Sequence, residues 1–139
     1  MVTSELRPTA EITVCVCTYR RPELLKRLLL SLGGQETSGL FSYSIVVVDN
    51  DRQKSGERVV GEFAAESKRA ISYHVEPVQG ICRARNRAVE CATGEFIAFI
   101  DDDEFASKSW LLELYQSCGR KGADGRSEER RVGKECRSR

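Results

Sequence analysis

Residues 12–32 read ITVCVCTYRRPELLKRLLLSL, and this stretch contains both kinds of element from which the fold is predicted. The first seven residues are small, apolar or β-branched and do not alternate with polar ones, which is typical of a strand covered on both faces. Pro22 suits the first turn of a helix, where its missing N–H is not needed. Leucines then recur at spacings of three and four until Gly33 and Gly34 end the pattern. A buried strand followed by an amphipathic helix is therefore predicted.

The same alternation returns three times further along the chain. The predicted strands are 43–49, 71–75 and 95–100, and the predicted helices are 55–67, 80–92 and 107–117. The helix over 80–92 is expected to bury a small apolar stripe made of Ile81, Ala84, Ala88 and Ala92. Strands that alternate with helices of ten or more residues predict an α/β fold, with an open, mainly parallel, Rossmann-like sheet and helices on both of its faces.

Length and composition indicate one globular domain. The chain has 139 residues, 40% hydrophobic and 31% charged, and its net charge of +1 does not point to nucleic acid or a membrane surface. No segment has the length and apolarity of a signal peptide or a membrane span. Six cysteines lack CxxC or zinc-finger spacing, so a reduced, cytoplasmic protein is predicted. Membrane association is expected only through a C-terminal part that this chain lacks.

The domain is predicted to cover residues 11–118, after a flexible N-terminus over 1–10. Residues 119–139 are almost free of apolar side chains and are expected to form a disordered tail. Within it, residues 126–139 (RSEERRVGKECRSR) look like the in-frame translation of a sequencing-library adapter, and the alternative is a native basic tail that contacts acidic partners. If residues 126–139 are an artefact, the chain is a truncated N-terminal half.

Polar residues follow each of the predicted strands. The fourth strand runs directly into Asp101, Asp102, Asp103 and Glu104. Two carboxylates about 4 Å apart repel by roughly 4 kcal/mol at an effective dielectric near 20, so such a turn must splay, hold protons or share a cation. A solvated turn is the simplest alternative. Because parallel strands place their carboxyl ends at one edge, where arginines and a helix N-terminus are also expected, the residues suit a phosphorylated ligand held through Mg²⁺ or Mn²⁺.

Four motifs together are similar to a known family. The segments ITVCVCTYRRPELLKRLLLSL, SIVVVDND, GICRARNRAVECATGEFIAFIDDDE and SWLLELY resemble, over residues 11–118, the nucleotide-sugar-binding half of family 2 glycosyltransferases with the GT-A fold. This resemblance implies a hexosyltransferase-like enzyme that transfers a sugar from a nucleotide-diphosphate sugar to a glycan, lipid or other acceptor. It also implies inverting, metal-dependent chemistry with Mg²⁺ or Mn²⁺, a D-x-D motif, and no nucleic-acid partner.

The resemblance assigns roles by position. Asp103 would be the metal ligand, Asp101 would lie near the ribose, and Asp49 would contact the nucleotide base. The full set of nucleotide-sugar-binding residues that it implies is Thr18, Arg20, Asp49, Arg85, Asn86, Asp101 and Asp102. Simpler interpretations stay open: Asp49 as a turn former after a strand, and the arginines near Arg85 as a solvated helix face.

The resemblance leaves the catalytic base unassigned. In the family this carboxylate comes from the second half of the domain, so the present chain alone is expected to bind donor without turning it over. Two alternatives are a non-catalytic nucleotide-sugar-binding module and a phosphohydrolase of the haloacid dehalogenase kind. The latter class places its nucleophilic Asp after the first strand of its core, where this chain has Thr18-Tyr19-Arg20.

Overall fold

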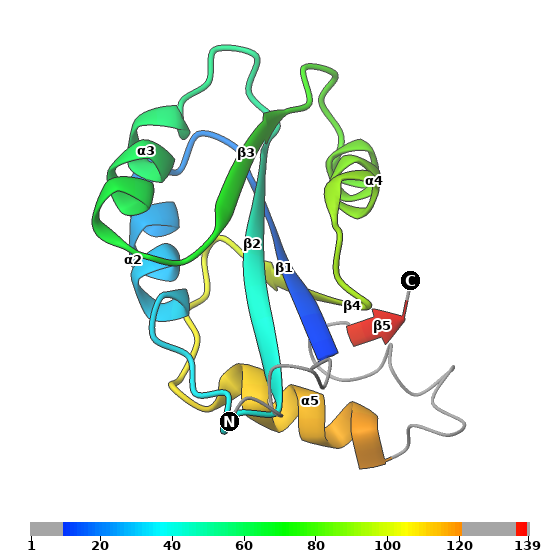
Figure 1. Cartoon of the computed structure of the whole chain (residues 1–139). Helices are drawn as coiled ribbons and strands as arrows, with labels where there is room; N and C mark the ends of the chain where they lie inside the picture. The colour runs from blue at the N-terminus through cyan, green and yellow to red at the C-terminus, as the bar shows by residue number, and fades with distance from the viewer. Residues whose placement is uncertain (1–9, 121–135, 139) are drawn as a thin grey trace.

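The computed structural model describes residues 10–120 and 136–138. Strands and helices alternate along most of this length (Figure 1). The elements are β1 (Ala10–Thr18), α2 (Pro22–Leu32), β2 (Phe41–Asp49), α3 (Glu57–Glu66), β3 (Ile71–Val75), α4 (Ile81–Cys91), β4 (Phe96–Asp101), α5 (Trp110–Arg120) and β5 (Cys136–Ser138). The four predicted strand–helix pairs are confirmed, and their bounds differ from the predicted ones by at most three residues.

The strand order in the sheet is β3-β2-β1-β4-β5, and the first four strands are parallel. After β1, the chain adds β2 next to β1 and β3 next to β2 on one side of the sheet. It then returns and adds β4 on the other side of β1. Ligands of open α/β sheets bind at such a reversal, outside the carboxyl ends of the strands. The register puts Thr18 opposite Asp49 and Cys17 opposite Asp101, so the polar ends of three strands meet at this edge.

Helices cover both faces of the sheet, as predicted. In Figure 1, α2 and α3 lie on one side of the strands and α4 lies on the other. The leucines of α2 that were predicted to face inward are buried at Leu25, Leu28, Leu29 and Leu32, in the core shared with α3 and α5. On the opposite face, Ala84 and Ala88 of α4 pack against the strands, and these small side chains let the helix approach the sheet closely.

One residue of the predicted stripe on α4 does not face the core. Ala84, Ala88 and Ala92 are buried, but Ile81 is 60% exposed. Ile81 is the first residue of α4, at the end of the helix that reaches the carboxyl edge of the sheet. Its side chain instead lines the pocket at this edge, and periodicity alone does not show where the sheet ends.

Gly94 fixes how closely β4 approaches β1. Its N–H donates a hydrogen bond of 2.9 Å to Oγ1 of Thr13. A Cβ atom at Gly94 would lie 2.7 Å from the backbone oxygen of Glu11 and 2.9 Å from the backbone nitrogen of Thr13. Only glycine fits so close to β1 without a shift of the backbone.

The predicted tail differs from the structure at two places. Helix α5 continues to Arg120, and residues 136–138 form β5, which pairs antiparallel with β4. Without β5, β4 would be an edge strand with unpaired backbone groups, and such an edge accepts a further strand. The other residues of the expected tail, 121–135 and 139, and residues 1–9 of the expected flexible N-terminus lie outside the described residues.

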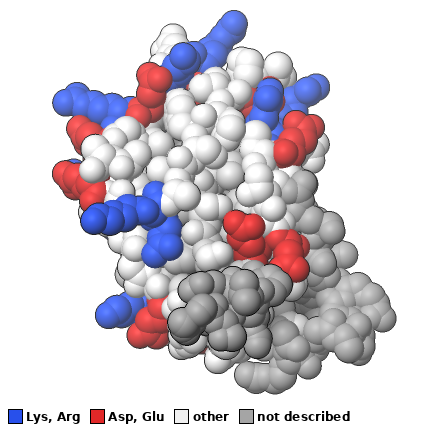
Figure 2. Space-filling model, viewed as in Figure 1, with Lys and Arg blue, Asp and Glu red and all other residues white. Residues whose placement is uncertain are grey.

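The visible surface carries both signs of charge. On the face shown in Figure 2, Lys and Arg side chains lie near Asp and Glu side chains rather than in one continuous basic area. Among the helices of the described residues, none is long and apolar enough to cross a membrane.

Candidate functional site

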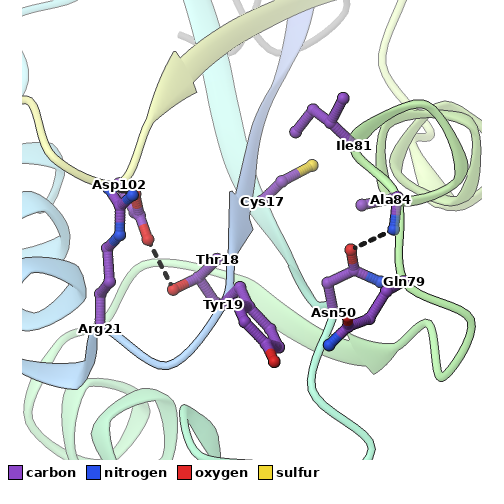
Figure 3. Close-up of a pocket in the computed structure, with 10 residues that line it drawn as sticks. Cys17, Thr18, Tyr19, Arg21, Asn50, Gln79, Ile81, Ala84 and Asp102 are labelled. Atoms are coloured by element: carbon purple, nitrogen blue, oxygen red, sulfur yellow. Dashed lines mark hydrogen bonds and ion pairs between the residues drawn. The ribbon is translucent and has the colours of Figure 1, made fainter.

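A pocket of about 330 Å³ lies at the carboxyl edge of the sheet. Its walls come from the ends of β1 and β2, the segment before α4, the first turn of α4 and the turn after β4 (Figure 3). The lining residues are Cys17, Thr18, Tyr19, Arg21, Asn50, Gln79, Gly80, Ile81, Ala84 and Asp102. The pocket is therefore where the strand order predicts a ligand site.

The acidic turn after β4 separates one buried carboxylate from the others. Asp101 and Asp103 are exposed, whereas Asp102 is buried at 6% exposure. Oδ2 of Asp102 accepts a hydrogen bond of 2.9 Å from Oγ1 of Thr18, and Oδ1 accepts one of 3.2 Å from the guanidinium of Arg21. Burial raises the pKa of Asp102, although the Thr18 hydrogen bond and the Arg21 charge act against this rise. Asp102 thus joins β1 to β4 instead of reaching into solvent.

The other carboxylates of the turn form a group that suits a cation. One oxygen each from Asp101, Asp103 and Glu104 lies within 4.8 Å of the others. Carboxylate oxygens are the ligands that Mg²⁺ prefers, usually one or two of them together with waters and substrate phosphates. The donor set therefore fits the divalent ion that the sequence predicts, with Asp103 accompanied by two neighbours.

Arginines surround this acidic group. The guanidinium of Arg85 lies 3.8 Å from Oδ1 of Asp101, and that of Arg21 lies 3.8 Å from Oδ2 of Asp103. Arg85 also stacks over the ring of Phe99, with its guanidinium carbon 4.8 Å from the ring centroid. Positive charge is thus held near the acidic turn from both sides, which suits a ligand with negative charge next to a cation.

Cys17 lies in the pocket as a neutral thiol. Its pKa is raised to about 11, mainly by burial and with smaller contributions from the charges of Asp101 and Asp102, while the charge of Arg85 acts to lower it. Nucleophilic cysteines need a thiolate, which a lowered pKa provides. The structure therefore gives Cys17 no role as a nucleophile.

The comparison with known proteins identifies the family. The family pattern described as "Glycosyl transferase family 2" matches residues 13–135, which is most of the chain. The chain belongs to glycosyl transferase family 2. This membership decides against the phosphohydrolase alternative, and it agrees with the motifs that the sequence shares with the family.

Two relatives illustrate the similarity of this family 2 chain. It is 37% identical over 115 residues to "Succinoglycan biosynthesis protein ExoM" of Rhizobium meliloti, which covers 83% of this chain and 37% of the relative. It is 35% identical over 106 residues to an uncharacterized glycosyltransferase of Methanocaldococcus jannaschii, with coverage of 76% and 36%. The chain thus spans a little over a third of the length of these relatives.

Solved structures show the GT-A fold. The mannosyltransferase PcManGT of Pyrobaculum calidifontis, in complex with GDP-Man and Mn²⁺, matches with a TM-score of 0.70 at 23% identity over 81% of this chain and 33% of that one. Residues 1–349 of S. aureus TarS in complex with UDP-GlcNAc match with a TM-score of 0.66 at 24% identity, over 81% and 32%. The family 2 chain therefore has the predicted GT-A architecture over its described sheet and helices.

The structure brings several of the predicted binding residues together. Thr18 and Asp102 line the pocket, and Arg85 and Asp101 pair beside it. Asn86 is exposed on α4 and is not part of the pocket lining. The binding roles assigned to these residues from the family resemblance remain predictions.

Arg20 pairs with an acidic residue of the next loop. Its Nε lies 3.5 Å from Oδ2 of Asp51, and its guanidinium stacks on Tyr19. A φ of 56° at Arg20 turns the chain sharply after β1. The contact with Arg20 also helps to lower the pKa of Asp51, after the larger effect of the Gln53 backbone hydrogen bond.

Asp49 is placed differently from the other predicted binding residues. It is fully buried, and its oxygens accept hydrogen bonds from Asp51 N, Gly56 N and the hydroxyl of Tyr73. Burial and the bond to Asp49 raise the pKa of Tyr73 far above its usual value. Asp49 anchors the loop after β2 and is not part of the pocket lining, so its contact with a nucleotide base stays a prediction.

The pocket also contains residues that were not predicted to bind a ligand, among them Tyr19, Arg21 and Gln79. Asn50 is another of them. It follows Asp49 directly and lines the pocket, with only 8% of its surface exposed. The available signal was its place in the polar run Asp49-Asn50-Asp51 at the end of a strand. Which member of such a run faces the pocket depends on the turn, and the turn was not predictable from the sequence.

Proposed function

We propose that this chain is the donor-binding part of a glycosyltransferase, and that the pocket holds a nucleotide-diphosphate sugar beside a divalent cation. The observation that carries the proposal is the pocket of about 330 Å³ adjoining the group formed by Asp101, Asp103 and Glu104 in a family 2 chain. Relatives in solved structures hold GDP-Man with Mn²⁺ or UDP-GlcNAc, which supports this ligand class.

In the proposed arrangement, the acidic residues bind the cation and the arginines bind phosphate. Asp101, Asp103 and Glu104 would hold Mg²⁺ or Mn²⁺, which supplies positive charge for the departing diphosphate. Arg21 and Arg85 flank this group and would bind the remaining phosphate charge. The nucleoside would occupy the pocket between the end of β1 and the first turn of α4.

The proposed reaction of the whole protein is inverting transfer of the sugar to an acceptor hydroxyl. Such a transfer needs a carboxylate base next to the acceptor, and the family resemblance places that base outside the part of the domain seen here. The 139-residue chain is therefore proposed to bind donor without sustained turnover.

A thermal-shift panel tests the donor-binding proposal. UDP, GDP and dTDP, each with and without Mn²⁺, would be added to the full chain, because a ligand that binds only the folded state raises its melting temperature. We expect a shift with at least one nucleotide, larger with Mn²⁺ than with EDTA. No metal-dependent shift with any of these diphosphates would contradict the proposal.

A further inference from the structure

We propose that Asn50 is a positioning residue that holds one wall of the pocket in place. This proposal rests on the proposed function, because the wall matters only if the pocket binds a ligand. The wall is the segment 76–80, which connects β3 to α4 and contributes Gln79 and Gly80 to the pocket. It contains no helix or strand of its own, so other contacts must fix it.

The side chain of Asn50 makes three hydrogen bonds to the backbone of this segment. Its Nδ2 donates to the oxygen of Glu76 at 2.8 Å and to the oxygen of Val78 at 3.0 Å. Its Oδ1 accepts from the N–H of Gly80 at 3.0 Å, the bond drawn in Figure 3. Both N–H donors of the Asn50 amide are used in this way, so the side chain acts as a template, meaning that its hydrogen bonds fix the backbone conformation of the segment.

The backbone at Gly80 shows why such a template is needed. Gly80 has φ of 143°, a conformation that residues with a side chain rarely adopt, and it lies directly before α4. Glycine loses more conformational freedom on folding than other residues, so an unsupported Gly80 would sample many states. The bond to Asn50 selects one of these states and sets where the first turn of α4 begins.

A second contact holds the same segment from outside the pocket. Oε1 of Glu76 lies 3.2 Å from Nη2 of Arg87, and Oε2 accepts a hydrogen bond from Val78 N at 3.1 Å. The hydrogen bond from Val78 keeps the pKa of Glu76 below its usual range, and Arg87 adds to this effect. Neither Glu76 nor Arg87 lines the pocket. Removing this contact should therefore loosen the wall without removing a direct contact to a bound ligand.

Two variants distinguish a positioning role of Asn50 from a direct contact between Asn50 and the ligand. Asn50→Ala removes both the template and any direct contact, whereas Arg87→Ala loosens only the wall. Gln53→Ala is the matched control, because Gln53 is an exposed amide in the same loop as Asn50. Unfolding midpoints of all variants show whether each one is still folded.

The experiment combines amide hydrogen exchange without ligand and calorimetric titration with UDP and GDP in the presence of Mn²⁺. We expect Asn50→Ala to speed exchange at Gly80 about fivefold or more, as for the loss of one hydrogen bond. We expect Asn50→Ala and Arg87→Ala each to raise the Kd for the nucleotide. In the double variant, the fold increase in Kd should be smaller than the product of the fold increases in the two single variants. Gln53→Ala should change neither quantity.

Three results would overturn the proposal: unchanged exchange at Gly80 in Asn50→Ala, faster exchange without weaker binding, or weaker binding in Asn50→Ala with none in Arg87→Ala. The last result would make Asn50 a direct ligand contact. If the unaltered chain binds no nucleotide, the proposed function fails, and exchange at Gly80 still decides whether Asn50 holds the segment.

Discussion

Oγ1 of Thr18 donates a hydrogen bond of 2.9 Å to Oδ2 of Asp102, across 84 positions of sequence. Thr18 ends β1 and Asp102 follows β4, so the bond fixes the relative position of two strand ends below the pocket. A buried carboxylate needs such partners, because removing it from water is costly when it is not hydrogen-bonded. With Asp102 held inward, Asp101 and Asp103 on either side of it face solvent.

Replacing Thr18 with valine should destabilise the fold. The change keeps the shape of the side chain but leaves the buried Asp102 with one donor fewer, which typically costs about 1–3 kcal/mol. Urea unfolding of the Thr18→Val variant measures this loss. Thr93→Val makes the same chemical change at an exposed position and should alter the free energy of unfolding little. Equal stability of the two variants would show that the bond contributes nothing.

Replacing Asp103 with asparagine should weaken metal-dependent nucleotide binding. The variant removes a charge from the group formed with Asp101 and Glu104, and it leaves the buried Asp102 untouched. A ligand at 100 times its Kd stabilises the folded chain by about 2.7 kcal/mol, and this gain with Mn²⁺ and nucleotide should fall in Asp103→Asn. Glu66→Gln, an exposed change on α3, serves as the control. A full thermal shift in Asp103→Asn would remove Asp103 from the metal site.

The single histidine should make stability depend on pH. Burial, followed by the charge of Arg87, lowers the pKa of His74 below its usual 6.5. The unfolded chain therefore binds more protons at this residue than the folded chain does. As the pH falls below 6.5, proton binding at His74 stabilises the unfolded state more than the folded state, so the free energy of unfolding decreases. Above pH 6.5 the contribution of His74 to the free energy of unfolding is constant.

His74→Gln removes this proton uptake. The unaltered chain should lose more stability between pH 7.5 and pH 5.5 than His74→Gln does, as measured by urea unfolding at each pH. Parallel curves for the two proteins over this interval would show that His74 has the same pKa in the folded and unfolded chains.

Gly94→Ala should destabilise the fold through a backbone clash. The new Cβ would lie 2.7 Å from the backbone oxygen of Glu11, and forcing extra atoms into a packed site typically costs about 1–3 kcal/mol. Gly61→Ala is the matched control, because Gly61 lies within α3 and has nothing within 4 Å of its added Cβ. Alanine should stabilise the helix there by about 0.5–1 kcal/mol. Thermal unfolding that ranks the two variants in the opposite order would contradict this account of the close approach of Gly94 to β1.

The sequence was sufficient to predict the four strand–helix pairs and the edge of the sheet where the pocket lies, but not β5. Apolar β-branched runs predict buried strands, and the leucine spacing after Pro22 predicts α2, because both signals come from local periodicity. The parallel arrangement follows from the alternation of these elements, and it places the polar strand ends together. The structure confirms that the polar strand ends lie together, because Thr18 is opposite Asp49 and Cys17 is opposite Asp101 in the strand register.

Side-chain direction within the polar turns was not predictable from the sequence. The run Asp101-Asp102-Asp103 does not show that its middle residue is the buried one, because this depends on Thr18 at the end of β1 and on Arg21 at the start of α2, both far away in the sequence. In the same way, Asn50 and not Asp49 faces the pocket. These choices are made by tertiary contacts, which leave no period in the sequence.

The most direct test of the central claim is the effect of Mn²⁺ on the amide NMR spectrum of the full chain, with and without UDP or GDP. Paramagnetic broadening is local, so it reports where the ion binds. We predict that broadening begins at residues 101–104, extends to the end of β1 near Thr18, and becomes stronger at the same residues when the matching nucleotide is added. Broadening centred elsewhere, or no selective broadening with nucleotide present, would contradict the claim that the acidic turn and the pocket form one donor site.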